Sequence, residues 1–107
     1  VVYTWVNGSD PAWQAAYARA LNTTAPPDPQ RFHDSGELLL SIASVAALAP
    51  WVRTIWVATA NQPPDTRLLA EGVRAKLRVV HHDAFIPAAY LPTFNSHAIE
   101  AHLHLIP

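Results

Sequence analysis

Apolar residues in this chain form three short, nearly continuous runs, at residues 1–6 (VVYTWV), 54–59 (TIWVAT) and 77–81 (LRVVH). Each run is rich in β-branched and aromatic side chains and lacks the strict apolar–polar alternation of a strand with one face in water. Such runs are typical of strands that are buried on both faces of a parallel sheet. We therefore predict three parallel, buried strands at these positions.

The segment between the first two runs contains two helix signals. Asp10 followed by Pro11 combines a capping side chain with a proline at the first helical position, so we predict a helix over residues 11–21. Asp34 and Glu37 have the spacing of a capping box, and apolar residues at helical intervals follow them. The sequence therefore also predicts a helix over residues 35–49.

Two further helices are expected after the second strand. Asp65 is placed to cap a short helix that runs through Glu71 and is closed by Gly72. Residues 91–107 (LPTFNSHAIEAHLHLIP) begin as a polar loop and continue with the spacing of a last helix. The resulting order, β-α-α-β-α-β-loop-α, predicts an α/β fold in which a Rossmann-like parallel sheet is flanked by helices.

One face of the last predicted helix carries His97, Glu100 and His104 at helical spacing. Most rows of this kind are solvated polar faces of a helix. These three side chains have a chemical role only if the fold places them at a binding site. The opposite face of the same helix carries the aliphatic side chains of Ile99, Leu103 and Ile106.

Polar segments follow all three predicted strands, at residues 7–10, 59–62 and 81–83. In open parallel sheets ligands bind outside the carboxyl ends of the strands, so these segments predict a site to which the loop at 91–97 also contributes. The aspartates in them fit equally well as helix caps and turn residues without a ligand. The predicted site residues are Asn7, Ser9, Asp10, Asn61, Gln62, His81 and Asp83.

Composition narrows the class of protein. At 107 residues the chain is one domain at most, and its net charge of −1 provides no basic field for nucleic acid. No apolar run reaches the roughly 18 residues of a membrane span, and no basic segment of a signal peptide precedes the first strand. The absence of cysteine excludes disulfides, thiolate nucleophiles and thiolate metal sites.

Four stretches share a specific order and spacing: VVYTWVNGSDP at 1–11, RFHDSGELLLSIASVAALAPWVRTIWVATANQPP at 31–64, VVHHDAF at 79–85 and LPTFNSHAIEAHLHLIP at 91–107. Together they resemble the first and second signature regions of the Stealth family of sugar-phosphate transferases. The resemblance implies a nucleotide-diphospho-sugar transferase-like fold. It also implies that residues 1–107 are the N-terminal part of a catalytic domain, incomplete at the C-terminus, whose pattern continues with an Asn-Asp-Asp stretch.

The resemblance implies a reaction as well. A hydroxyl of an acceptor glycan attacks the β-phosphate of a uridine diphosphate (UDP) sugar, hexose-1-phosphate such as N-acetylglucosamine-1-phosphate is transferred, and uridine monophosphate (UMP) leaves. Such chemistry usually employs a divalent cation, here Mg²⁺ or Mn²⁺, and a group that removes the hydroxyl proton. Bacterial relatives are expected at the cytoplasmic face of a membrane and animal relatives in the Golgi lumen.

Residue roles follow from the same comparison. Glu100 matches the family's acidic residue and is expected to act as a base or as a metal-linked carboxylate. His104 and Asp10 are the further catalytic residues that the resemblance implies. Substrate-binding roles are implied for Trp5, Asn7, Gly8, Ser9, Gln62, His81, Asn95 and Ser96.

The chain departs from the family pattern at several positions. Asn7 stands where aspartate is usual, Leu39 and Ala43 stand where many relatives have arginine, and Ala60 replaces an acidic or amide residue. These departures support an alternative in which the protein is a degenerate module that binds a nucleotide sugar or a glycan without turnover. A simple glycosyltransferase, which breaks the bond on the sugar side of the phosphate, is a second alternative.

A structural zinc site is the third alternative. Imidazoles spaced as His-x-His, together with a carboxylate one turn away, can bind this metal. On a helix, however, His102 points to a different side from Glu100 and His104. The candidate ligands are His97, His102, His104 and Glu100.

Overall fold

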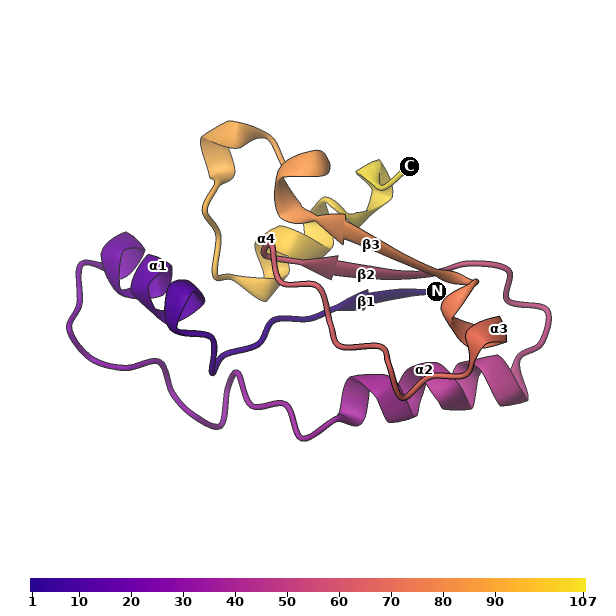
Figure 1. Cartoon of the computed structure of the whole chain (residues 1–107). Helices are drawn as coiled ribbons and strands as arrows, with labels where there is room; N and C mark the ends of the chain where they lie inside the picture. The colour runs from indigo at the N-terminus through magenta and orange to yellow at the C-terminus, as the bar shows by residue number, and fades with distance from the viewer.

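The computed structural model describes residues 1–107 and is built around a three-stranded parallel sheet (Figure 1). Its strands are β1 (Val2–Thr4), β2 (Ile55–Thr59) and β3 (Leu77–His81), in the spatial order β1-β2-β3. The central strand β2 pairs in parallel with both neighbours. The prediction of three parallel strands is therefore confirmed.

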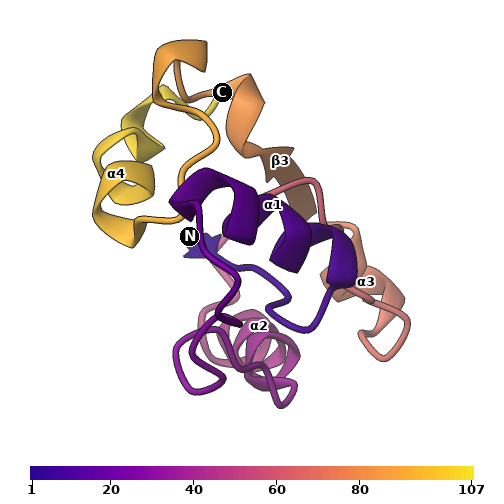
Figure 2. The same ribbon diagram turned by 90° about the vertical axis from the view of Figure 1, so that its left-hand side faces the viewer.

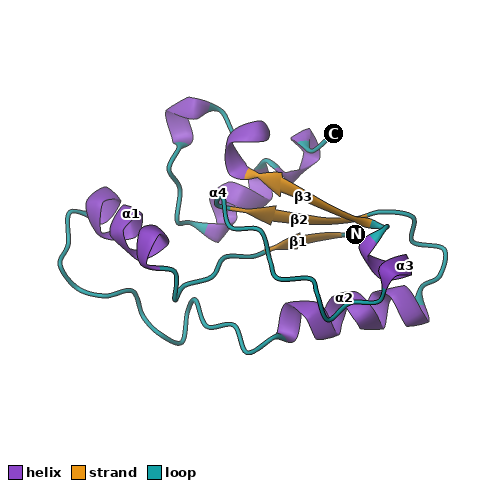
Figure 3. Ribbon diagram, viewed as in Figure 1, coloured by secondary structure: helices purple, strands orange, loops and turns teal.

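Helices flank this sheet, as the secondary-structure colouring of Figure 3 shows. They are α1 (Pro11–Leu21), α2 (Glu37–Leu48), α3 (Glu71–Arg74) and α4 (Ser96–Ala101), with short 3₁₀ turns at 82–84, 88–90 and 103–105. The helix α1 lies beyond the carboxyl ends of the strands and is in front of the sheet in Figure 2. The architecture is a small α/β domain of the Rossmann-like type. None of the helices is long and apolar enough to cross a lipid bilayer.

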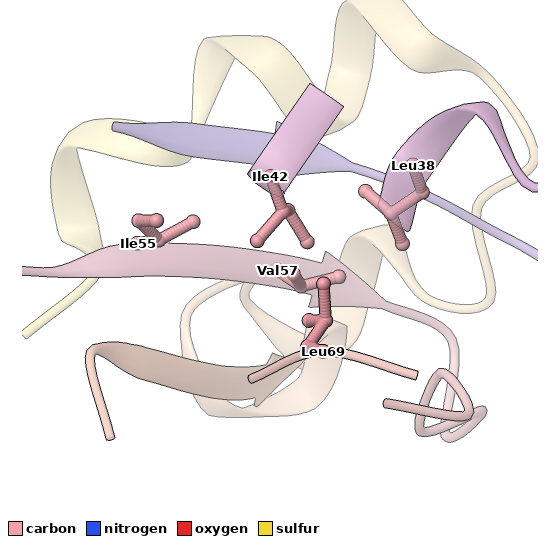
Figure 4. Packing of buried hydrophobic residues seen from close by; sticks show 5 residues of the cluster. All are labelled: Leu38, Ile42, Ile55, Val57 and Leu69. Carbon is pink, nitrogen blue, oxygen red and sulfur yellow. The ribbon is translucent and has the colours of Figure 1, made fainter. Parts of the chain in front are cut away.

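The core consists of one hydrophobic cluster on each face of the sheet. Side chains of β2 alternate between the two clusters, so this strand is buried on both faces as predicted. On one face the β2 residues pack against α2 and the segment before α3 (Figure 4), and that cluster comprises Leu38, Ile42, Ile55, Val57 and Leu69. The cluster on the other face comprises Ala58, Val80, Phe85, Ile86 and Ile99.

The two outer strands are less buried than their apolar sequences predict. Strand β1 pairs only over Val2–Thr4, and Val1 and Val2 remain 50% and 40% exposed. In β3 the side chain of Val79 is 38% exposed. The prediction of burial on both faces is wrong for these strands, because each lies at an edge of the sheet and has a neighbour on one side only.

The predicted helix over residues 65–71 is wrong as well. The carboxylate of Asp65 binds the backbone N–H of Arg67 at 3.1 Å and its guanidinium at 2.6 Å, which closes a turn instead of capping a helix. These bonds hold the pKa of Asp65 down at about 2. Helix α3 begins only at Glu71, and Gly72 lies inside it rather than at its end.

Helix boundaries around α2 and α4 also differ from the sequence pattern. Asp34 accepts a hydrogen bond from the N–H of Gly36 at 2.8 Å, and α2 begins one residue later, with Gly36 as its cap at φ 91°. At the other end of the chain, the backbone bond of His102 goes to Ile99, three residues back. This tighter bonding ends α4 and starts a 3₁₀ turn, so the last helix is not continuous.

Candidate functional site

The loop after β1 is tied to the end of β2 by the buried side chain of Gln62. Its Oε1 accepts the N–H of Asn7 at 3.0 Å, and its Nε2 donates to the carbonyl of Asn7 at 3.0 Å and to Oδ2 of Asp10 at 2.8 Å. One amide therefore joins two loops that are far apart in the sequence. Three of the strand-end residues predicted from the sequence, Asn7, Asp10 and Gln62, are thus joined into one assembly.

Within this assembly, Asp10 and Asn7 also complete local turns. Asp10 caps α1 by accepting the N–H of Ala12 at 2.9 Å, and Oδ1 of Asn7 accepts the N–H of Ser9 at 3.0 Å. The hydrogen bond from the Gln62 amide, followed by that from Ala12, lowers the pKa of Asp10. The carboxylate of Asp10 is thus ionised at neutral pH and held in a fixed position.

Gly8 lets a second loop approach the first. A Cβ built on Gly8 would overlap both the Cβ and the carbonyl oxygen of Phe32. Gln14 donates from its side chain to the Gly8 carbonyl at 2.8 Å, which fixes the loop against α1. The structure therefore gives Gly8 a packing role, and that role accounts for a glycine at this position.

Two adjoining pockets open at the carboxyl ends of the strands. The first pocket has a volume of about 300 Å³ and is lined by Thr4, Trp5, Val6, Trp13, Arg31, Phe32, His33, His82, Thr93, Phe94, Ser96 and Ile99. The second pocket has a volume of about 470 Å³ and is lined by Asp10, Ala12, Trp13, Ala16, Ala60, Asn61, Gln62, His82, Asp83, Leu91, Pro92, Thr93 and Phe94.

Four residues line both pockets and form a shared wall: Trp13, His82, Thr93 and Phe94. The rings of Trp13 and Phe94 meet edge to face at 5.5 Å, and Trp13 also meets Phe32 at 4.8 Å. Tyr17 joins the same aromatic group. These rings anchor α1 to the loops at 31–33 and 93–94, so α1 contributes to the wall of each pocket.

None of the four wall residues is among the predicted site residues, and His82 is the one of them with an ionisable side chain. It is 6% exposed, and its Nε2 has no hydrogen-bond partner. Burial lowers the pKa of His82, with Asp83 opposing and His81 assisting this shift, so the ring is neutral at pH 7. His81, which was singled out instead, ends β3 and lines neither pocket. The two-residue repeat of side-chain direction along a strand was the signal that could have separated the two histidines. Side chains of consecutive strand residues point to opposite faces, so His81 and His82 cannot both face the same pocket.

His82 makes stability depend on pH below its ordinary pKa of 6.5. The unfolded chain binds a proton at His82 more readily than the folded chain does. The stability that the neutral ring contributes is therefore fully present above pH 6.5 and falls as pH drops towards the lowered folded-state pKa. We expect the melting temperature to fall more between about pH 7.5 and about pH 5 in the wild type than in His82→Phe. Thermal unfolding followed by circular dichroism measures both, and equal falls would contradict this expectation.

The other predicted site residues differ in their position relative to the pockets. Trp5 and Ser96 line the first pocket, Asp10, Gln62, Asn61 and Asp83 line the second, and Asn7, Gly8, Ser9 and Asn95 line neither. Glu100 and His104 are exposed and line neither, so their catalytic roles stay predictions. No group of three histidine, aspartate or glutamate side chains lies close enough to hold a metal ion, and the zinc site considered above does not form.

Asn95 has a structural role that the sequence comparison did not assign. It is the N-cap of α4 and accepts the N–H of His97 at 3.0 Å. We expect Asn95→Ala to lower the free energy of unfolding by about 1 kcal/mol, whereas Asn95→Asp, which keeps a capping oxygen, changes it by a few tenths at most. Urea denaturation compares the variants, and equal losses in both would argue against the cap.

The fold and the pockets define a class of protein: a Rossmann-like α/β domain with two pockets outside the carboxyl ends of its parallel strands. Comparison with known sequences identifies the family within this class. Stealth conserved region 1 matches residues 1–25 and Stealth conserved region 2 matches residues 31–107. The chain belongs to the Stealth family.

Three relatives illustrate the similarity over the whole chain. A capsular polysaccharide phosphotransferase of Neisseria meningitidis serogroup B is 43% identical over 100% of this chain, and one of Actinobacillus pleuropneumoniae is 45% identical over 100%. An exopolysaccharide phosphotransferase of Streptomyces coelicolor is 44% identical over 99%. The chain spans 30% of the length of each of the first two relatives and 18% of the third.

Proposed function

We propose that the protein transfers a hexose-1-phosphate, such as N-acetylglucosamine-1-phosphate, from a UDP-sugar to a hydroxyl of an acceptor glycan during polysaccharide synthesis. The relatives named above are phosphotransferases of capsular and exopolysaccharides. The observation that carries the proposal is the pair of adjoining strand-end pockets, because their linings differ in chemistry and fit different parts of a sugar nucleotide.

The first pocket suits the nucleoside and its phosphates. Trp5 and Phe94 provide aromatic surface on which a planar base can stack. Arg31, whose guanidinium lies 5.2 Å from the centre of the Phe32 ring, provides a cation with the fork geometry that phosphate oxygens prefer. Stacking surface and a guanidinium in one pocket support binding of an aromatic, anionic ligand.

The second pocket suits the sugar. Asp10 and Asp83 provide carboxylate oxygens that accept hydrogen bonds from sugar hydroxyls, and the amide of Asn61 can both donate and accept. Each pocket volume is at least that of a small ligand site, and the shared wall places the pockets next to each other. The arrangement supports a single elongated donor that occupies both.

In the transfer step one bond to the β-phosphorus forms and another one breaks. The acceptor oxygen bonds to phosphorus, the bond from phosphorus to the oxygen that bridges the two phosphates breaks, and UMP leaves with that oxygen. The hydroxyl proton passes to a base, for which we propose Glu100. The residues described do not by themselves form a site for Mg²⁺ or Mn²⁺, since no three carboxylate or imidazole side chains lie close enough together to hold a metal ion.

The experiment follows the phosphate. The full-length protein is incubated with an acceptor glycan, Mg²⁺ or Mn²⁺ and a UDP-sugar that carries ³²P in its β-phosphate. We expect the label to enter the glycan together with the sugar. A simple glycosyltransferase would leave the label in UDP, and a degenerate binding module would bind the donor and form no product, so either result would overturn the proposal.

A substitution tests the base. Glu100→Gln removes the proton acceptor and is expected to reduce turnover by about 100-fold or more. Glu71→Gln is the matched control, because Glu71 is exposed in α3 and lines neither pocket. Turnover of Glu100→Gln near that of the control would remove Glu100 from the mechanism and leave the transfer reaction itself in place.

A further inference from the structure

His82 lies in the wall between the two pockets with an unused ring nitrogen. Its Nε2 is closed off from solvent and has no partner within the protein. A buried polar atom without a hydrogen bond destabilises the folded state, so its presence calls for a compensating role. We infer that His82 is a ligand-binding residue whose Nε2–H donates to an oxygen of the sugar-linked phosphate of the donor, which rests on the function proposed above.

Packing alone does not explain a histidine at this position. The ring meets Phe85 edge to face at 6.0 Å, a contact that a phenylalanine ring makes equally well. Phenylalanine would also avoid the unpaired nitrogen. The feature of His82 that packing leaves unused is its hydrogen-bonding capacity, and that capacity lies in the wall shared by the two pockets.

The surroundings of His82 identify the group it meets. The first pocket carries Arg31 and His33, and the second carries Asp10 and Asp83, so one side suits phosphate and the other suits hydroxyls. The phosphate that carries the sugar is the part of the donor that joins these two sides. Burial lowers the pKa of His82, although the nearby charge of Asp83 acts in the opposite direction. The imidazole is therefore neutral and can donate one hydrogen bond.

Ligand entry also has a structural requirement. Because Nε2 is covered in this structure, a phosphate oxygen reaches it only when a neighbouring side chain moves. Thr93 and Phe94 lie on a loop that lines both pockets and precedes α4. These two residues and Trp13 share the wall with His82, so the side chain that moves belongs to its immediate surroundings in that wall.

Calorimetric titration of the full-length protein tests the inference. The sugar nucleotide is whichever of UDP-N-acetylglucosamine, UDP-glucose and UDP-galactose binds the wild type most tightly. The comparison ligand is UMP, which lacks the sugar-linked phosphate. We expect His82→Phe to weaken the affinity for the sugar nucleotide about tenfold or more and to leave the affinity for UMP within about twofold. His97→Gln, an exposed histidine outside both pockets, is the matched control and is expected to bind both ligands like the wild type.

The outcomes separate this inference from the proposed function. Binding of the sugar nucleotide to the wild type and to His82→Phe with equal affinity would overturn the role of His82 and leave the function standing. An equal loss of affinity for both ligands in His82→Phe would also overturn the role of His82 as a phosphate ligand, since the ring would then act only through packing of the wall. A wild type that binds none of these ligands would overturn the function first, and the inference with it.

A spectroscopic readout observes the contact itself. In protein labelled with ¹⁵N-histidine, the Nε2 resonance of His82, assigned by its absence in His82→Phe, is expected to shift on addition of the sugar nucleotide. Addition of UMP is expected to leave it in place. A resonance that moves equally with both ligands, or with neither, would contradict a hydrogen bond to the sugar-linked phosphate.

Discussion

Replacing Gln62 with glutamate is expected to lower the free energy of unfolding by about 2–4 kcal/mol near neutral pH. The substitution keeps the shape of the side chain but removes the two donors that reach the Asn7 carbonyl and the Asp10 carboxylate. It also places a second carboxylate 2.8 Å from Oδ2 of Asp10, in a side chain that is only 7% exposed. Lost hydrogen bonds and like-charge repulsion therefore act together.

The repulsion predicts how this variant responds to acid. Two carboxyl groups at this distance raise the pKa of one member of the pair, so the folded variant takes up a proton before the unfolded chain does. Its stability relative to the wild type is expected to rise as pH falls from about 7 to about 5, because His82 destabilises both proteins alike in this range, whereas Gln30→Glu follows the wild type. Gln30 is an exposed control whose side chain makes no hydrogen bond. Urea denaturation across this range decides, and a loss that does not depend on pH would refute the repulsion.

Replacing Gly8 with valine is expected to destabilise the fold by about 3 kcal/mol or more, because the new side chain has to displace backbone and not merely a flexible side chain. Both the Cβ and the carbonyl oxygen of Phe32 occupy the space. Phe32 belongs to the aromatic group that anchors α1, so the first pocket is expected to open at the same time. A reduced affinity for nucleotide should therefore accompany the loss of stability.

Gly72 provides the matched control for this substitution. A Cβ built there meets nothing within 4 Å, and the residue lies inside α3. Gly72→Ala is expected to stabilise the protein by about 0.5–1 kcal/mol, because alanine loses less backbone entropy in a helix. Urea denaturation of both variants makes the comparison. A Gly8→Val variant as stable as the wild type would show that the loops at 7–10 and 31–33 separate without cost.

Much of the fold could be predicted from the sequence, because local signals and packing agree. The apolar run of β2 becomes a strand buried on both faces, and Asp10 with Pro11 starts α1 at the predicted residue. The errors occur where two local options compete. Asp65 offers the same side chain to a helix and to a turn, and the nearby guanidinium of Arg67 decides for the turn.

The candidate site was predicted less completely, for a different physical reason. Strand-end position correctly brings Asp10, Gln62 and Asn61 together, because all carboxyl ends of a parallel sheet meet at one edge. The sequence predicted His81 as a site residue, whereas His82 lines the pocket in the structure. The difference arises because the direction of a side chain depends on the twist of its strand and on where the strand ends. Glu100 is exposed while its neighbour Ile99 is buried, as expected of a solvated polar helix face, and its catalytic role came from the family resemblance and not from periodicity.

The outer edge of β1 bears on how residues 1–107 behave in concentrated solution. Val1 and Trp5 use their backbone groups to pair with β2, so those of Val2 and Thr4 face the other way and have no strand beside them. The segment at 1–6 carries no charged side chain and no proline, the two features that usually prevent such an edge from recruiting another copy. For a polypeptide of residues 1–107 alone, self-association through β1 is thus expected to grow with protein concentration, and Val2→Lys offers a direct way to suppress it.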